Sequence, residues 1–209
     1  IIMTEGYELT YEEFYGEAFC TMKLAEKQLM RIVDEFPQSA FEDLKPIVYC
    51  CSRIKTPDSM IKKLSKQNLP QDGRTALSEV FDAIGIRIVC AFAEDVYQVV
   101  EWLRERAEWG VIREKDYFAY PKPNGYRSYH LRIIIKEGRG KGLPAEIQVR
   151  TIATDFWATL EHQLKYKKDL EYEKLIRSEL KRCADEIASV DLSMQTIRDI
   201  IRNEKCEIE

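Results

Sequence analysis

Ala83-Ile-Gly-Ile-Arg-Ile-Val-Cys-Ala-Phe92 is rich in β-branched and apolar residues, and it predicts a central strand. Residues 94–106 follow with valines and a leucine at helical spacing, which indicates an amphipathic helix. Further strands are expected at residues 111–117, 128–135 and 145–151. Because strands and helices are interspersed and neighbouring strands are joined by turns, the sequence predicts an α/β or α+β domain around a mixed sheet.

Helices are expected before this region. Thr10 and Glu13 have capping-box spacing, and a helical pattern continues from them toward Glu35 as one long helix. Residues 46–51 form a short apolar run that fits either a strand or a buried turn. Thr56-Pro57 then begins a second helix, with Thr at the N-cap and Pro at the first helical position.

Helical patterns also close the chain, from Ile152 and again over residues 171–202. Residues 138–142 alternate Gly with Arg and Lys between two strands. They predict a hairpin turn, because the order of a phosphate-binding loop is absent. We therefore expect a domain over residues 1–170, including the N-terminal helix, and a C-terminal helical extension over residues 171–209.

Composition limits the classes of function. A net charge of −4 argues against a protein that coats nucleic acid, so any basic site must be local. The cysteines lack C-x-x-C spacing and there are only two histidines, which makes a zinc site or a histidine-rich metal centre unlikely on spacing alone. No apolar run is long enough to cross a bilayer, and the first residues lack the order of a signal peptide. We expect a cytoplasmic protein.

The segment Asp116–His130 combines tyrosines, cations, two prolines and an Asn-Gly turn in fifteen residues. Aromatic rings stack on bases and cations bind phosphate, so this mixture is typical of a nucleotide site. Side chains alternate across a strand, so the following strands each present a polar face. If the two strands pair, one sheet face carries Ser128, His130 and Arg132 beside Glu146, Gln148 and Arg150. A solvated outer face is the alternative.

A second cationic region precedes the first expected strand of the sheet centre. Residues 53–66 hold five cations against one acid, and helix-start amides beside Arg53 and Lys55 indicate a polyphosphate cradle. A solvated basic helix is the alternative. Asp82 stands at the entrance of the strand that carries Arg87, which suits a Mg²⁺ ligand because phosphates and waters complete its octahedron. A turn-capping Asp82 and an ion-paired Arg87 are equally compatible with the pattern.

Together these segments resemble the synthetase domain of the RelA/SpoT family, and most closely the small alarmone synthetases of the RelQ type. The resemblance rests on five ordered motifs within residues 46–167: Ser52-Arg-Ile-Lys-Thr-Pro-Asp-Ser59 with Lys63, Asp82-x-x-Gly-Ile-Arg87, Tyr120-Pro-Lys-Pro-Asn-Gly-Tyr-Arg-Ser-Tyr-His130, Glu146-Ile-Gln-Val-Arg-Thr151, and Asp155-Phe-Trp-Ala-Thr-Leu-Glu-His162. It implies a nucleotidyltransferase-like mixed sheet wrapped by helices, with long N- and C-terminal helices. It also implies a homotetramer assembled through the C-terminal helices.

The implied activity is that of a GTP/GDP diphosphokinase. Such an enzyme moves the β,γ-pyrophosphate of ATP to the 3′-hydroxyl of GDP or GTP, giving ppGpp or pppGpp and AMP in the stringent response. By resemblance, the ATP ligands are Arg53, Lys55, Ser59, Lys63 and Arg87, and the ligands of the acceptor nucleotide are Lys122, Asn124, Tyr126, His130, Gln148 and Asp155.

Chemistry assigns the remaining roles. A 3′-hydroxyl is a poor nucleophile, so we expect Glu146 to act as its base. Asp82, with Glu146 sharing the ion, is expected to hold Mg²⁺ against the charge of the phosphates. A carboxylate at Asp155 would accept from the N1 and N2 hydrogens of guanine and disfavour adenine.

Two other readings stay open. Related small synthetases use adenine nucleotides or the 3′ end of tRNA as acceptor, although the net charge of −4 gives little support to RNA binding. A non-catalytic nucleotide- or RNA-binding oligomer is the second, which the presence of both Asp82 and Glu146 disfavours. GDP and GTP share base and ribose, so the sequence does not rank them.

Overall fold

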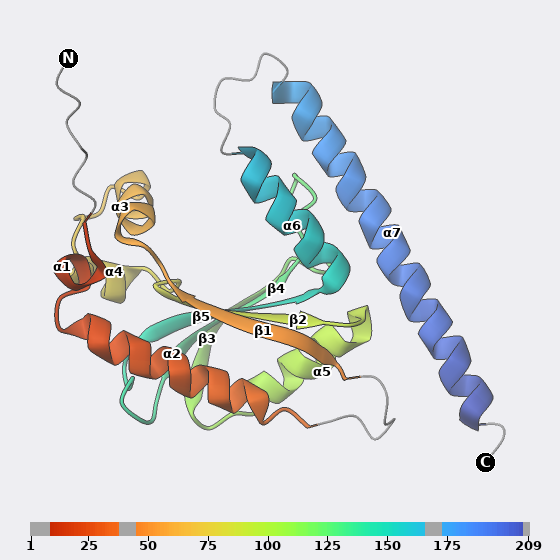
Figure 1. Ribbon diagram of the computed structural model, residues 1–209, viewed down its shortest axis with the longest axis horizontal. Coiled ribbons are helices and arrows are strands. Elements are labelled where there is room, and N and C mark those ends of the chain that lie inside the picture. The colour runs from red at the N-terminus through yellow and green to blue at the C-terminus, as the bar shows by residue number, and fades with distance from the viewer. Residues whose placement is uncertain (1–8, 38–44, 166–172, 207–209) are drawn as a thin grey trace.

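The computed structural model describes residues 9–37, 45–165 and 173–206, and its centre is a five-stranded sheet (Figure 1). The strand order is β1-β2-β5-β4-β3. Only β2 and β5 run parallel, and the other neighbours are antiparallel, which confirms the mixed sheet. The strands are β1 (Ile47–Ile54), β2 (Ile84–Cys90), β3 (Trp109–Asp116), β4 (Tyr129–Ile135) and β5 (Pro144–Thr151).

The sheet order confirms one expectation and settles another. The strand within residues 83–92 is β2, an interior strand with β5 on one side. On its other side it pairs with β1, which forms the edge of the sheet. The apolar run at residues 46–51 is therefore part of an edge strand, not a buried turn. The Gly-rich segment 138–142 joins antiparallel β4 and β5, and Gly138 and Gly142 have φ of +80° and +87°, as a hairpin turn requires.

Seven helices flank the sheet within the described ranges: α1 (Tyr11–Tyr15), α2 (Ala18–Asp34), α3 (Pro57–Lys66), α4 (Gly73–Glu79), α5 (Ala93–Arg104), α6 (Ile152–Lys165) and α7 (Glu173–Cys206). Helices α2 and α5 cover one face of the sheet, and α6 and α7 lie on the other side (Figure 1). None of them is long and apolar enough to span a bilayer, as far as the described residues extend.

The core lies between the sheet and the pair α2 and α5. Every second residue of β2 and β4 faces inward, and the isoleucines at these positions are at most 1% exposed. Met22, Leu29 and Leu103 from the two helices are buried in the same core. Burying each such side chain contributes roughly 1.5–3 kcal/mol. Because the apolar side chains of these strands face α2 and α5, the polar side chains lie on the opposite face of the sheet.

The N-terminal helix is broken where one long helix was expected. The capping box of Thr10 and Glu13 is confirmed, with each backbone amide bonded to the other side chain. Gly16 then has φ of +60°, a conformation that side-chain-bearing residues rarely adopt, and the chain turns there between α1 and α2. The turn directs Tyr15 toward the chain before α3, where its hydroxyl donates to the Lys55 carbonyl at 2.7 Å.

The second predicted helix is confirmed as α3, with Thr56 at its N-cap accepting from the Ser59 amide at 3.4 Å. Helix α4 was not expected. It is short and held by a local signal, because Asp72 caps it by accepting from the Thr75 amide at 2.8 Å. Gly73 opens this helix against the backbone of α1, so α1, α3 and α4 pack together at one end of the sheet (Figure 1).

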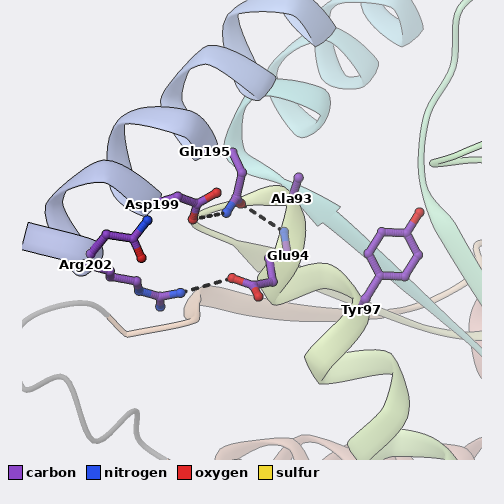
Figure 2. A pocket seen from close by; sticks show the side chains of 7 residues that line it. Ala93, Glu94, Tyr97, Gln195, Asp199 and Arg202 are labelled. Atoms are coloured by element: carbon purple, nitrogen blue, oxygen red, sulfur yellow. Dashed lines mark hydrogen bonds and ion pairs between the residues drawn. The ribbon is translucent and has the colours of Figure 1, made fainter. Parts of the chain in front are cut away.

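Helix α7 contacts the domain along both halves. Its N-terminal half packs on α6, where Trp157 Nε1 donates to the Leu180 carbonyl at 2.8 Å, and its C-terminal half is fixed to α5. Arg198 is 3% exposed, and its guanidinium donates to Asp95 of α5 at 2.6 Å. Gln195 accepts from the Glu94 amide at 3.1 Å, and Arg202 donates to the Glu94 carboxylate at 3.0 Å (Figure 2). An ion pair buried to this degree needs both partners, because removing one leaves an uncompensated charge.

Candidate active site

Two neighbouring cavities share the side chains of Lys63 and Asp82. The larger has a volume of about 590 Å³ and lies between α3, the strand end before it and the start of β2. Its lining contains five cations and one carboxylate, so it attracts anions. The lining residues are Tyr11, Arg53, Ile54, Lys55, Thr56, Ser59, Lys62, Lys63, Lys66, Asp82 and His162.

The smaller cavity, of about 280 Å³, lies on the polar face of β3, β4 and β5. The register of these strands builds it in rows: Arg132 pairs with Glu146, and His130 stands between Lys115 and Gln148. This pairing confirms the single polar face expected from alternation. The lining residues are Lys63, Asp82, Arg113, Lys115, Tyr117, Lys122, His130, Arg132 and Glu146.

Asp82 lies where the two cavities meet. Lys55 and Lys63 each place Nζ 2.7 Å from its Oδ2. Burial opposes ionisation, but the two ammonium groups outweigh it and hold the pKa of the Asp82 carboxyl below its usual value. The other oxygen, Oδ1, is buried and has no hydrogen-bond partner. A buried carboxylate oxygen without a partner is unfavourable, so this atom is free to bind a cation.

Glu146 is 6% exposed and is surrounded by donors. His130 Nδ1 and Gln148 Nε2 lie 3.4 Å and 3.0 Å from its Oε1, and Arg132 Nε donates to Oε2 at 3.2 Å. Burial raises the pKa, but the bonds from His130, Gln148 and Arg132 together lower the pKa of the Glu146 carboxyl far below its usual value. Glu146 is therefore ionised at neutral pH.

The residues fit a magnesium ion that brings its own phosphate ligands. Within the described residues, no three acidic, cysteine or histidine side chains form a ready-made cage. Mg²⁺ does not need one, because it takes one or two carboxylates and completes its shell with phosphates and waters. Asp82 offers Oδ1, and Glu146 faces the same cavity.

The loop before β4 presents Lys122 between two rings. Its Nζ lies 4.6 Å from the centroid of Tyr117 and 4.9 Å from that of Tyr126. Gly125 has φ of +89°, and a Cβ there would lie 2.4 Å from the Ala184 Cβ of α7, so only glycine fits this turn. Asn124 donates to Glu161 of α6 at 3.0 Å, which holds the loop to that helix.

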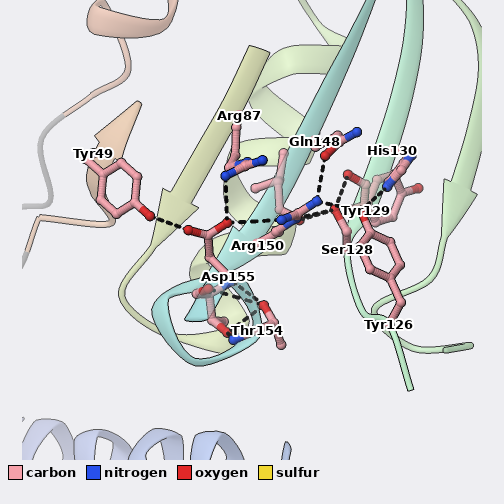
Figure 3. Close-up of polar contacts among 12 residues, drawn as sticks. Tyr49, Arg87, Tyr126, Ser128, Tyr129, His130, Gln148, Arg150, Thr154 and Asp155 are labelled. Carbon is pink, nitrogen blue, oxygen red and sulfur yellow. Dashed lines mark hydrogen bonds and ion pairs between the residues drawn. The ribbon is translucent and has the colours of Figure 1, made fainter. Parts of the chain in front are cut away.

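A buried cluster adjoins the smaller cavity (Figure 3). Asp155, in the first turn of α6, accepts from Arg150 at 3.0 Å, pairs with Arg87 at 3.3 Å and accepts from the Tyr49 hydroxyl. Arg150 is 4% exposed and Asp155 is 5% exposed. The site that guanine was expected to occupy at Asp155 is thus filled by protein groups.

The structure brings eight of the candidate residues to the walls of the two cavities: Arg53, Lys55, Ser59, Lys63, Asp82, Lys122, His130 and Glu146. Five others line neither cavity: Arg87, Asn124, Tyr126, Gln148 and Asp155. Arg113 and Lys115 also line the smaller cavity and are not among the residues predicted from the sequence. The alternation rule identifies them once it is applied to residues 111–117, because Lys115 pairs with His130 and Arg113 with Arg132.

A third cavity, of about 560 Å³, lies between α5 and α7 and contains none of the candidate residues (Figure 2). Its lining mixes Glu94, Asp199 and Arg202, so it lacks the positive charge of the first two. The paired cationic cavities are therefore the better candidate for a phosphate-bearing substrate.

Comparison with known proteins agrees with this geometry. The model of the region found in RelA/SpoT proteins matches residues 52–171. The chain is 38% identical over 156 residues to GTP pyrophosphokinase YwaC of Bacillus subtilis, covering 73% of this chain and 74% of that protein. It is 34% identical over 160 residues to GTP pyrophosphokinase YjbM of the same organism, covering 75% and 74%. The crystal structure of small alarmone synthetase 1 from Bacillus subtilis with its product pppGpp superposes with a TM-score of 0.76, at 30% identity, over 91% of this chain and 97% of that one.

Proposed function

The chain belongs to the RelA/SpoT family, and on this premise we propose that it is a (p)ppGpp synthetase. It transfers the β,γ-pyrophosphate of ATP to the 3′-hydroxyl of GDP or GTP and releases AMP. The observation that carries the proposal is the pair of cationic cavities that share Asp82 and Lys63. A transfer between two nucleotides needs two adjoining anion sites with the reacting phosphorus at their junction.

ATP is assigned to the larger cavity. Arg53, Lys55 and Lys63 supply positive charge for its phosphates, and Ser59 adds a hydroxyl at the positive end of α3. Arg87 does not line this cavity, but its side chain is paired with Asp155 and remains 31% exposed. We assign it to the adenine side of ATP, since a guanidinium plane stacks on a base.

The acceptor nucleotide is assigned to the smaller cavity. Lys122 and His130 face its phosphates, and Arg113 and Lys115 add positive charge that the sequence argument did not include. Tyr126 presents an aromatic ring beside Lys122, suited to guanine. Asn124 and Gln148 act by holding the loop and Glu146, as their bonds to Glu161 and to Glu146 indicate.

The reaction places the ribose 3′-oxygen in line with the β-phosphorus of ATP. The new bond joins that oxygen to the β-phosphorus, the bond to the oxygen of the α-phosphate breaks, and AMP leaves with the electron pair. Mg²⁺, held by Asp82 with Glu146 beside it, would offset the charge of the transferred group. Glu146 accepts a hydrogen bond from the 3′-hydroxyl and takes its proton as the bond forms. Its lowered pKa makes it a weak base, so orienting the hydroxyl is its larger contribution.

We also propose that residues 1–170 form the catalytic domain and that residues 171–209 serve self-association as a homotetramer. Helix α7 supports this, because its side facing away from the domain carries an apolar stripe at helical spacing. The stripe, Val190, Met194, Ile197 and Ile201, is between 49% and 60% exposed.

The test is a product assay with purified protein, Mg²⁺ and labelled ATP. We expect AMP and a 3′-pyrophosphorylated guanine nucleotide only when GDP or GTP is present. Parallel reactions with AMP, ATP and tRNA as acceptors identify a different acceptor class. Glu146→Gln keeps the shape of the side chain and should lower kcat by about 1000-fold. AMP release without any acceptor dependence would overturn the proposal.

A further inference from the structure

We infer that Arg150 and Asp155 are positioning residues that link the donor arginine Arg87 to the catalytic carboxylate Glu146, and that Asp155 does not read the guanine base. This inference rests on the proposed synthetase function. Neither residue lines a cavity, and both side chains are more than nine-tenths buried.

The first half of the link runs from the donor side to Asp155. Its Oδ1 receives Arg87 Nη1 at 3.3 Å and Arg150 Nη1 at 3.0 Å, while Oδ2 accepts from the Tyr49 hydroxyl. These three donors engage both carboxylate oxygens, and the two arginines share Oδ1. A guanine base would have to compete with these protein donors to reach Asp155.

The second half runs from Arg150 to Glu146 by two routes. Arg150 Nη2 donates to the Tyr126 hydroxyl at 2.6 Å and to Gln148 Oε1 at 2.7 Å. Gln148 Nε2 donates to Glu146 Oε1 at 3.0 Å. The Tyr126 hydroxyl is 2.9 Å from His130 Nε2 (Figure 3). His130 Nδ1 is 3.4 Å from the same Glu146 oxygen.

The two ends of the network fix the direction of its bonds. A guanidinium only donates, so Tyr126 and Gln148 accept from Arg150, and an ionised carboxylate only accepts, so His130 Nδ1 and Gln148 Nε2 donate to Glu146. With the proton of the imidazole on Nδ1, His130 Nε2 accepts from the Tyr126 hydroxyl. Gln148 accepts from Arg150 through Oε1, which aims its NH₂ group at Glu146. Arg150 at one end and Glu146 at the other thus set the tautomer of His130 and the orientation of Gln148.

The register explains why the link crosses the site. Gln148 of β5 pairs with Arg87 on one side and with His130 on the other. Arg150 lies two residues further along β5 on the same face, near the end of the strand, where Asp155 in the first turn of α6 can reach it. Disturbing the pair should therefore misplace the donor and acceptor sides together, which lowers kcat more than it weakens either substrate.

The main variants are Asp155→Asn and Arg150→Lys. Asparagine keeps the shape of Asp155 without its charge, and lysine keeps the charge of Arg150 without the fork that reaches three acceptors. Steady-state kinetics with ATP and with either GDP or IDP separate the possible roles, since IDP lacks the 2-amino group of guanine. We expect kcat to fall by about 100-fold in each variant. The ratio of kcat/KM for GDP over IDP should stay at the wild-type value.

Tyr49→Phe tests the same network at a more exposed side chain, in case Asp155→Asn or Arg150→Lys fails to fold. It removes one donor from Asp155 at a side chain that is 45% exposed, and we expect a fall in kcat of about 5-fold. Tyr97→Phe is its matched control, because Tyr97 is 38% exposed and its hydroxyl donates to Asp116 at 3.3 Å, outside both cavities. It should retain wild-type kcat.

The outcomes separate the inference from the function on which it rests. If the wild-type protein makes no tetraphosphate or pentaphosphate product, the synthetase proposal fails. If the wild type is active and Asp155→Asn instead lowers the preference for GDP over IDP, then Asp155 reads the base and the inference is wrong. Wild-type kcat in folded Asp155→Asn or Arg150→Lys, with unfolding temperature checked by calorimetry, would equally overturn it.

Discussion

At the scale of single residues, the site holds two ionised carboxylates in different surroundings. Asp82 is balanced by the full charges of Lys55 and Lys63 on one oxygen, and its other oxygen is unsatisfied. Glu146 has donors on both oxygens, from neutral groups as well as from Arg132. The first arrangement is ready to bind a cation, while the second fixes a carboxylate in one orientation. This difference supports separate roles for the two acids.

Removing the charge of Asp82 tests its role as metal ligand. Asp82→Asn should lower kcat by about 1000-fold and raise the Mg²⁺ concentration that gives half-maximal rate, because Lys55 and Lys63 would then repel the ion. The measurement is initial rate against Mg²⁺ concentration at saturating nucleotides.

Asp58→Asn is the matched control for that experiment. Asp58 is an exposed acid in the first turn of α3 and lines neither cavity, so its loss should leave the Mg²⁺ dependence unchanged. An Asp82→Asn enzyme with the wild-type Mg²⁺ dependence would show that Asp82 does not bind the ion.

At the scale of elements, the period of two in strands made the polar face predictable. That period predicts one face for His130, Arg132 and Glu146, and the pairing of β4 with β5 confirms it. The place of Asp155 was less predictable, because it depends on the angle between β5 and α6. The sequence pattern does not contain that angle. The segment 145–151 and the helix after it were expected, yet the contact between Arg150 and Asp155 was not.

The break at Gly16 and the short helix α4 escaped prediction for local reasons. One glycine inside a helical pattern costs only about 1 kcal/mol, so the pattern alone does not show a break. Helix α4 has seven residues, and its cap at Asp72 resembles an ordinary turn signal. Both features serve the packing of α1 beside the larger cavity.

Gly73 tests whether this packing shapes the ATP site. A Cβ at position 73 would lie 2.3 Å from the Phe14 carbonyl oxygen and 2.9 Å from Tyr15 Cα. Backbone atoms do not yield easily, so Gly73→Ala should push α1 away and lower the free energy of unfolding by about 1–3 kcal/mol. Since Tyr11 of α1 lines the larger cavity, KM for ATP should rise more than KM for GDP.

Chemical denaturation and steady-state kinetics check both parts of this prediction. Ser78→Ala is a suitable control. Ser78 is exposed on the same helix and lines neither cavity. Equal increases of both KM values in Gly73→Ala would indicate a general loss of structure instead of a specific effect on the ATP site.

At the scale of the whole molecule, the sheet carries the site between two sets of helices. The polar face of β3, β4 and β5 forms the smaller cavity, and α3 with α1 closes the larger one. Helix α7 runs beside α6 (Figure 1) and supplies no lining residue to either cavity. Its Leu180 and Ala184 anchor it to α6, and its Arg198 anchors it to Asp95 of α5. No part of the described chain covers its outward apolar stripe, so these side chains are exposed to water. Exposing a contiguous apolar surface to water is unfavourable.

Self-association through that stripe predicts a change of mass on substitution. Met194→Lys with Ile201→Lys places two charges in the stripe and should convert the oligomer into a monomer of 24.5 kDa, as measured by light scattering after gel filtration. Ser189→Lys with Thr196→Lys adds the same charge at exposed positions of α7 outside the stripe and should leave the mass unchanged. Both cavities are built within one chain, so the monomer should keep measurable synthetase activity. A wild-type protein that is already monomeric at micromolar concentration would refute self-association through α7, because a stable protein–protein interface persists at such dilution.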